Sequence, residues 1–449
     1  MDLERILIDR RRFLRAGASA AALASVAQYS AVSARARGGA GADDYRALVC
    51  VFLYGGADTF NLLVPASASG YATYAASRGD LAETRASLLP ITPVGIGAGE
   101  YGVHGSCPEL QTLFETGKLA FVGNVGPLVE PTTKAEYLGN QRRIPPYLFS
   151  HNDQQRQWQI ARASGSGEAG WAGRLLDGFP FAGGPSSIPP GIGVEQTAQL
   201  LNGNRVSPFV VGTEGPLEID GYEASDRRAV RDALLAADPH PLAQALKRTT
   251  TEAVDIANLL GTELAGAPTF ETLFGQGPLE EQLRIVARLI SIRSQLGVGR
   301  QVFFVGMGGF DTHDSQTANL PGLFAQVSRA LSGFQNAMEQ IGEAQRVTAF
   351  THTEFGRTLS SNGQGSDHGW GGHAMVMGGA VQGQRLFGTM PDLSLDGPDD
   401  VGEGRILPTT SVDQLAATLS RWFGATPSEL GAVFPNLGNF QTSDLGFLA

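Results

Sequence analysis

Three apolar runs constrain the fold of this chain most, because each reads as a strand and each ends in a polar cluster beside glycine. Residues 46–54 (RALVCVFLY), 301–307 (QVFFVGM) and 346–352 (RVTAFTH) run into GGADTFN, GGFDTHD and TEFGR. Apolar runs of this length, bounded by turn residues, are typical of strands buried on both faces of a parallel sheet. Ligands of open parallel sheets bind outside the carboxyl ends of the strands. We therefore expect the three polar clusters to meet in one site.

Helical patterns between the apolar runs predict an α/β fold. Residues 108–117 have proline at the start, apolar residues at helical spacing and glycine at the end, and the apolar run at 118–125 completes a βαβ unit. Further helical patterns cover residues 224–247, 250–265, 278–297, 321–342 and 412–423. We expect a mainly parallel central sheet flanked by helices, in a single domain over residues 37–449 with a mostly helical insertion at about 200–297.

The N-terminus has the layout of a twin-arginine (Tat) export signal over residues 1–36. Arg10, Arg11 and Arg12 precede an alanine-rich run at 16–27 and a set of small residues suited to cleavage. A basic amphipathic helix and a membrane anchor are the alternatives, but the run is shorter than the ~20 residues that a spanning helix needs. We expect the Tat translocase as a partner, a periplasmic or extracellular location and no stable membrane span.

Charge and cysteine content narrow the classes of partner. Without residues 1–36, the chain has 27 basic and 41 acidic residues, a net charge of −14. Such a chain is not expected to bind nucleic acid. Two cysteines, Cys50 and Cys107, are too few for a disulfide framework. They allow one disulfide, although Cys50 in its apolar run is equally consistent with a buried free thiol.

Seven residues in the polar clusters are candidate metal ligands. They are Asp58, Asp311, His313, Glu354, Asp367, His368 and His373, and the last three lie in the glycine-rich stretch SNGQGSDHGWGGH at 361–373. Each alone has a plainer interpretation, such as a turn aspartate, a glutamate at a helix start or a structural histidine. Together they could hold one or two divalent ions, which we expect to be zinc, calcium or manganese. We expect the glycines to form a tight loop that aims its side chains at one point.

Ser150 is the candidate nucleophile, because it opens a helix whose first N–H groups favour an anion. A plain N-cap serine fits the same position. Thr59, Ser106 and Cys107 are rival nucleophiles. The sequence Ser150-His151-x-Asp153 suggests a serine triad, but adjacent residues at a helix start point in different directions. Arg357 is the candidate to hold the anionic oxygens of a substrate.

Long motifs of the chain resemble a known bacterial family, domain of unknown function 1501. The resemblance rests on FLYGGADTFNLLVP, LFSHNDQQRQWQ, GGFDTHDSQ, HTEFGRTLSSNGQGSDHGWGGHAMVMGGAVQG and the tail RILPTTSVDQLAATLSRWFG. That family resembles the alkaline phosphatase and sulfatase superfamily, which implies an alkaline phosphatase-like fold and metal-dependent ester hydrolysis. The resemblance further implies ligand roles for Asp58, Asp311, His313, Asp367, His368 and His373, with Glu354 at the third strand end, and a nucleophile role for Ser150. The sulfatase pattern Cys-x-Pro-x-Arg is absent.

Two classes of function remain open on the sequence. The first is an exported metal-dependent hydrolase of phosphate or sulfate esters that uses Ser150 and acts on a small-molecule or saccharide ester. The second is a catalytically inactive, metal-stabilised binding or assembly protein of the cell envelope. A metal-independent serine esterase is a weaker third reading, because the chain lacks the G-x-S-x-G turn at Ser150.

Overall fold

The computed structural model describes residues 44–162, 167, 169–179, 188–217, 233 and 240–449. All helices and strands named below belong to the unit Tyr45–Ala449. The export signal predicted over residues 1–36 and much of the helix predicted over 224–247 lie outside the described residues.

A ten-stranded sheet forms the centre of this unit, in the order β14-β5-β13-β10-β1-β9-β6-β7-β8, with β15 paired to β5. Neighbouring strands are parallel except at β10–β13, β13–β5 and β7–β8. This confirms the predicted α/β class with a mainly parallel sheet. The strands are β1 (Arg46–Leu53), β5 (Leu119–Gly126), β6 (Gly191–Val194), β7 (Phe209–Gly212), β8 (Gly215–Pro216), β9 (Arg300–Met307), β10 (Val347–His352), β13 (Gly372–Met377), β14 (Leu386–Phe387) and β15 (Thr410–Ser411).

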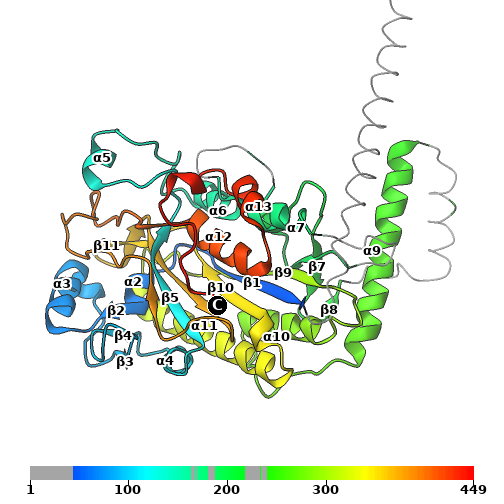
Figure 1. Ribbon diagram of the computed structural model, residues 1–449. Helices are drawn as coiled ribbons and strands as arrows, with labels where there is room; N and C mark the ends of the chain where they lie inside the picture. Colours follow the sequence, from blue (N-terminus) through cyan, green and yellow to red (C-terminus); the bar gives the residue numbers. More distant parts are fainter. Residues whose placement is uncertain (1–43, 163–166, 168, 180–187, 218–232, 234–239) are drawn as a thin grey trace, which may run out of the picture. The chain divides into compact units, whose positions relative to one another are not determined.

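Helices cover both faces of the sheet (Figure 1). Side chains of β1 alternate between two cores: Ala47, Val49 and Val51 enter one, and Leu48, Cys50 and Phe52 the other. This alternation explains why the first apolar run is continuous rather than alternating. The first core is completed by α4 (Pro108–Glu115), α9 (Pro241–Ala265), α10 (Pro278–Ser291) and α11 (Gln316–Gln340), and the second by α6 (His151–Ile160), α7 (Trp171–Leu176), α12 (Val412–Phe423) and α13 (Pro427–Val433).

Smaller elements surround the carboxyl ends of the central strands. One of them is a three-stranded sheet of β2 (Leu63–Pro65), β3 (Leu89–Ile91) and β4 (Tyr101–Val103). The others include the short helices α2 (Thr59–Leu62), α3 (Ala68–Arg78) and α5 (Lys134–Leu138). A hairpin of β11 (Arg357–Ser361) and β12 (Ser366–His368) follows β10 and places Arg357 opposite His368. The stretch expected as a helical insertion contributes β7 and β8 to the central sheet as well as α9 and α10.

The stretch at 361–373 is therefore not the tight loop expected from its glycines. Residues 366–368 pair with β11, and residues from 372 onwards pair with β5 and β10. The glycines serve close packing instead: a Cβ at Gly371 would come within 2.0 Å of Asn124 Oδ1. His368 and His373 consequently belong to different strands.

The ends of β1, β9 and β10 lie close together, as the polar clusters predict. These strands are neighbours in the sheet with parallel pairing. The turn after β1 contacts the turn after β9 directly, since a Cβ at Gly55, which has a φ of 116°, would lie 2.3 Å from the Asp311 backbone nitrogen. Glycine at this position is thus what lets the two polar clusters meet.

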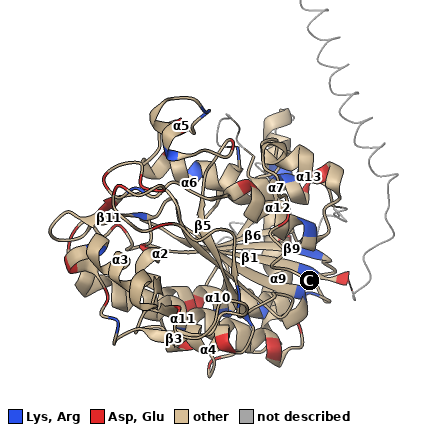
Figure 2. Ribbon diagram, turned by 60° about the vertical axis from the view of Figure 1, so that its left-hand side comes forward, with Lys and Arg blue, Asp and Glu red and all other residues tan. Residues whose placement is uncertain are grey.

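Both cysteines are free and buried, and they lie in different cores: Cys107 belongs to the first core, with Ala47 and Val49, whereas Cys50 belongs to the second, on the other face of the sheet. Within the described residues, no helix has the length and apolar character to cross a membrane. Lysine and arginine residues are interspersed with aspartate and glutamate over the described chain (Figure 2).

Candidate metal centre

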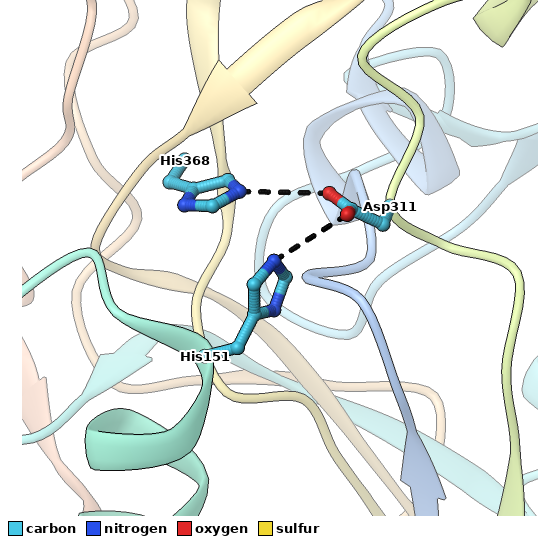
Figure 3. Close-up of side chains that lie close together, drawn as sticks. All are labelled: His151, Asp311 and His368. Carbon is cyan, nitrogen blue, oxygen red and sulfur yellow. Dashed lines mark ion pairs between the residues drawn. The ribbon is translucent and has the colours of Figure 1, made fainter.

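Three side chains from distant parts of the sequence converge beyond the strand ends (Figure 3). Asp311 follows β9, His368 ends β12, and His151 is the first residue of α6. One ligand atom from each lies within 4.8 Å of the others. The Asp311 carboxylate stands between the two rings, with Oδ2 3.5 Å from His151 Nε2 and Oδ1 3.5 Å from His368 Nε2.

His313 adds a third imidazole to this group. Its Nε2 lies 2.8 Å from His368 Nε2 and 3.2 Å from Asp311 Oδ1. Asp311, His313 and His368, which the sequence predicts as ligands, are therefore brought together. We call His151, Asp311, His313 and His368 the histidine cluster.

The opposite nitrogen of each ring has an acceptor of its own. His151 Nδ1 lies 2.8 Å from Glu354 Oε1, His313 Nδ1 lies 2.8 Å from Asp367 Oδ1, and His368 Nδ1 lies 2.7 Å from the Phe149 carbonyl. Carboxylate and carbonyl oxygens only accept, so these partners assign the proton of each ring to Nδ1. The Nε2 lone pairs of the neutral rings then face the centre. Metal-bound histidines almost always have such partners on the other nitrogen.

The close approach of His313 and His368 tests whether a cation suits the centre. With both Nδ1 atoms protonated, two bare Nε2 lone pairs face each other at 2.8 Å. Such lone pairs repel unless a proton or a metal ion lies between them. Burial lowers the pKa of His368, assisted by the nearby His151, Arg357 and His313 and opposed by the bond to the Phe149 carbonyl. A metal ion bound by both Nε2 atoms would relieve this repulsion, and imidazole nitrogens with a carboxylate are common transition-metal ligands, so the residues fit a metal.

Asp311 is held ionised and fixed in place. Its partial burial alone would raise the pKa, but the hydrogen bond and charge of Arg357, with His151 and His313, outweigh burial and lower it. Arg357 is fully buried. Besides Asp311, its guanidinium donates to the carbonyls of Gly55 (2.7 Å), Gly56 (2.9 Å), Phe310 (3.1 Å) and Ser366 (2.9 Å). Arg357 therefore links the strand ends and orients Asp311, rather than standing free to hold a substrate as the sequence suggested.

Glu354 and Asp367 lie behind the rings instead of facing the centre. Glu354 is fully buried, and its Oε1 accepts from Gly55 N and Gln155 Nε2, both at 2.9 Å, in addition to His151. Asp367 also accepts from Asn362 Nδ2 at 3.2 Å. Burial would raise the pKa of Asp367, but hydrogen bonds from Asn362 and His313 and the nearby positive charge lower it. Both carboxylates are thus placed to strengthen histidine ligands.

Asp58 and His373 lie in other surroundings. Asp58 is fully buried in an ion pair with Arg78 and accepts from Gln316 Nε2 at 2.6 Å. His373 accepts from the Asn124 backbone N–H at 3.2 Å through Nδ1, and its ring packs edge-on against Phe60. Burial lowers the pKa of His373 to about 3, so the ring is neutral. Neither side chain is among the described contacts of the histidine cluster.

Ser150 adjoins the cluster through its neighbour His151. It is the N-cap residue of α6; its hydroxyl donates to Asp153 Oδ2 at 2.6 Å and accepts no capping hydrogen bond from the backbone of the helix. The rival Thr59 accepts from the His373 backbone N–H, and Cys107 is fully buried.

His151 belongs to the histidine cluster but was not among the metal ligands predicted from the sequence. The sequence shows it only as the residue after Ser150, where it is weighed as part of a triad. The signal that could have found it is its place at the start of a helix that follows a strand of the central sheet, since such a start lies at the same edge as the strand ends.

Comparison with known proteins identifies a family for this chain and several solved structures with a similar fold. The family model "Protein of unknown function (DUF1501)" matches residues 45–434. No curated protein matches the chain. Similar solved structures include a protein in the alkaline phosphatase superfamily from Vibrio parahaemolyticus, with 9% identity, a TM-score of 0.37 and coverage of 85% of this chain and 67% of that one.

Two further solved structures share this level of likeness. The lipoteichoic acid synthase LtaP from Listeria monocytogenes has 8% identity, a TM-score of 0.35 and coverage of 86% and 74%. The PsFucS1 sulfatase from Pseudoalteromonas sp. has 9% identity, a TM-score of 0.34 and coverage of 86% and 68%. These likenesses concern the fold alone, whereas the family match spans nearly all of the described chain. The chain belongs to the DUF1501 family of proteins of unknown function.

Proposed function

We propose that the protein is a metal-dependent hydrolase of phosphate or sulfate esters that works at the histidine cluster. The observation that carries the proposal is the convergence of three imidazole Nε2 atoms on one ionised carboxylate, with an acceptor behind each ring. Titratable groups gathered at strand ends, among them Asp311 and His368 with lowered pKa values, are typical of functional sites.

His151, Asp311, His313 and His368 would hold the ion. A set of three imidazoles and one carboxylate suits zinc or another transition metal better than calcium, which prefers oxygen ligands. When bound, such an ion supplies Lewis-acid polarisation of an ester oxygen and stabilises developing negative charge. Phe355 is buried and packs against the rings of His151 and His368, with centroid distances of 4.9 Å and 4.6 Å, which limits their movement.

Ser150 is the candidate nucleophile of this reaction. As its Oγ attacks the phosphorus or sulfur atom, the hydroxyl proton passes to Asp153, which already accepts from it at 2.6 Å. The bond from phosphorus or sulfur to the alcohol oxygen breaks, and the departing alcohol takes up the proton that Asp153 received, which leaves Asp153 ionised again. Water then attacks the Ser150 ester, which releases phosphate or sulfate and restores the hydroxyl.

We place this activity outside the cytoplasm, in the periplasm or beyond, because residues 1–36 have the layout of a Tat signal. The Tat translocase is then the partner during export, and the substrate is a small-molecule or saccharide ester. A reporter fused to residues 1–36 and expressed with and without a working Tat system tests the export step. Loss of export only when the system is disabled is the expected result, and export through the general secretory route would contradict it.

The hydrolase proposal is tested on protein purified from the periplasm without chelator. Wild type, His368→Ala and Ser150→Ala are compared with His240→Ala, which removes a histidine at the cap of α9. Metal per chain is measured by elemental mass spectrometry, and hydrolysis is followed with chromogenic phosphate and sulfate monoesters.

We expect metal and hydrolysis in wild type and His240→Ala, loss of both in His368→Ala, and loss of hydrolysis alone in Ser150→Ala. Metal content unchanged in His368→Ala would refute the assignment of the centre. Metal lost in His368→Ala without hydrolysis of any ester by wild type would favour the second reading, a metal-stabilised binding or assembly protein.

A further inference from the structure

The seven carboxylate and histidine ligands expected from the sequence would suffice for two ions, but the structure separates Asp58 from the histidine cluster. Asp58 lies in the turn after β1, at the same edge of the sheet as the cluster. Its side chain is fully buried, so a charge-balancing group must come from within the protein. Within the described residues, its Oδ1 has no hydrogen-bond partner, and its Oδ2 faces Arg78 and Gln316.

Arg78 supplies that balancing charge. It is the last residue of α3 and is fully buried, and its guanidinium forms an ion pair with Asp58. Its other terminal nitrogen donates to the carbonyls of Thr358, at 2.7 Å, and Leu359, at 3.3 Å. Both carbonyls belong to β11, so the guanidinium is fixed to the strand that also carries Arg357.

Gln316 connects the Asp58–Arg78 pair to the backbone of the cluster. Its Nε2 donates to Asp58 Oδ2 at 2.6 Å, while its Oε1 accepts from Ser366 Oγ at 2.5 Å and from Thr312 Oγ1 at 3.2 Å. Thr312 stands between Asp311 and His313, and Ser366 directly precedes Asp367. The pair is therefore an immediate neighbour of the centre and not a remote surface contact.

We infer that the Arg78 guanidinium stands where a second metal ion would have to bind, so that the centre holds one ion and not two. The inference rests on the proposed function, in which the histidine cluster holds an ion. A guanidinium stays protonated and cannot leave the buried pair without exposing an unpaired charge. A divalent ion approaching Asp58 would also meet the fixed positive charge of Arg78 and be repelled. Of the two arrangements that the sequence left open, one ion or two, the arrangement with two ions therefore does not fit these residues.

The experiment counts zinc ions per chain on metal-stripped full-length protein. Isothermal titration with zinc gives the number of equivalents, and elemental mass spectrometry after desalting gives an independent count. The variants are Asp58→Asn, which keeps the shape of the side chain, and the double variant Asp58→Leu/Arg78→Met, which removes both buried charges together. His368→Ala serves as the comparison that disables the cluster, and circular dichroism checks that each protein is folded.

We expect one equivalent in wild type, in Asp58→Asn and in the double variant, and none in His368→Ala. Two equivalents in wild type, with one of them lost in Asp58→Asn or in the double variant, would overturn the inference while leaving the hydrolase proposal intact. If Asp58→Asn does not fold, the double variant decides between the same two outcomes. No zinc bound to wild type would overturn both the inference and the proposed metal centre, so the two failures are distinguishable.

Discussion

Glutamine at position 354 is predicted to weaken metal binding without disturbing the fold. Glu354 Oε1 accepts from Gly55 N at 2.9 Å, from Gln155 Nε2 at 2.9 Å and from His151 Nδ1 at 2.8 Å. A glutamine oxygen can accept the same three hydrogen bonds, so the shape and the partners survive. What is lost is the negative charge behind His151, and with it part of the basicity of His151 Nε2.

The expected loss follows from the role of such a carboxylate. Removing the partner behind a metal-bound histidine typically weakens metal affinity 10- to 100-fold, which is about 1.4–2.7 kcal/mol. We expect the same range for Glu354→Gln, because the carboxylate is buried and solvent screens it little. Asp367→Asn, behind the more exposed His313, should give a smaller effect in the same direction.

Competition between the protein and a chromophoric chelator for zinc at neutral pH measures this affinity. Glu130→Gln is the matched control, because its carboxylate pairs with Arg142 and Arg143 near the surface. We expect the control to bind zinc like wild type. A Glu354→Gln affinity within about twofold of wild type, in folded protein, would show that His151 is not a ligand and would refute the account of the centre.

Three further predictions concern stability. Burial holds the pKa of the His373 ring at about 3, so below about pH 6.5 the ring takes up a proton in the unfolded chain but not in the folded one. The free energy of unfolding therefore falls as the pH drops towards 3. His373→Phe should reduce this slope by about 1.4 kcal/mol per pH unit, as measured by urea titration. An unchanged slope would contradict this. Burial raises the pKa of Asp413 to about 7, so the free energy of unfolding falls as the pH rises from about 4, where the unfolded chain ionises, to about 7. Asp413→Asn should therefore raise the melting temperature at pH 8 more than at pH 5, and equal shifts would contradict this. Arg78→Met should lower the free energy of unfolding by about 3–5 kcal/mol, because it leaves Asp58 buried without its charged partner. Adding Asp58→Leu should restore most of that loss. Denaturant titration measures both variants, and a loss below about 1 kcal/mol in Arg78→Met would refute the argument.

The sequence predicted the elements whose apolar pattern is local and strong. The three runs that end in polar clusters are the adjacent strands β1, β9 and β10, and the helix starts at Pro108 and after Ser150 lie where their caps indicated. The pairing around residues 361–373 could not be read in this way. It depends on partners far along the chain, such as β5, and short strands rich in glycine have no periodicity of their own.

The sequence indicated several residues of the candidate site but not how their side chains are arranged. The end of β9 places Asp311 and His313, whereas His368 reaches them through the pairing of β12 with β11, which the sequence did not predict. The sequence also could not show that Arg78, twenty residues after Asp58, neutralises that aspartate, or that Arg357 turns inwards to backbone carbonyls. Such choices follow from which buried charges find partners in three dimensions, and a single sequence does not display them.

Crystals grown with zinc, measured on both sides of the zinc absorption edge, test the central claim most directly. The account predicts one anomalous peak, at about 2.0–2.2 Å from the Nε2 atoms of His151, His313 and His368 and from an oxygen of Asp311. A zinc-loaded protein with no peak at the histidine cluster, or with its peak beside Asp58, would contradict it.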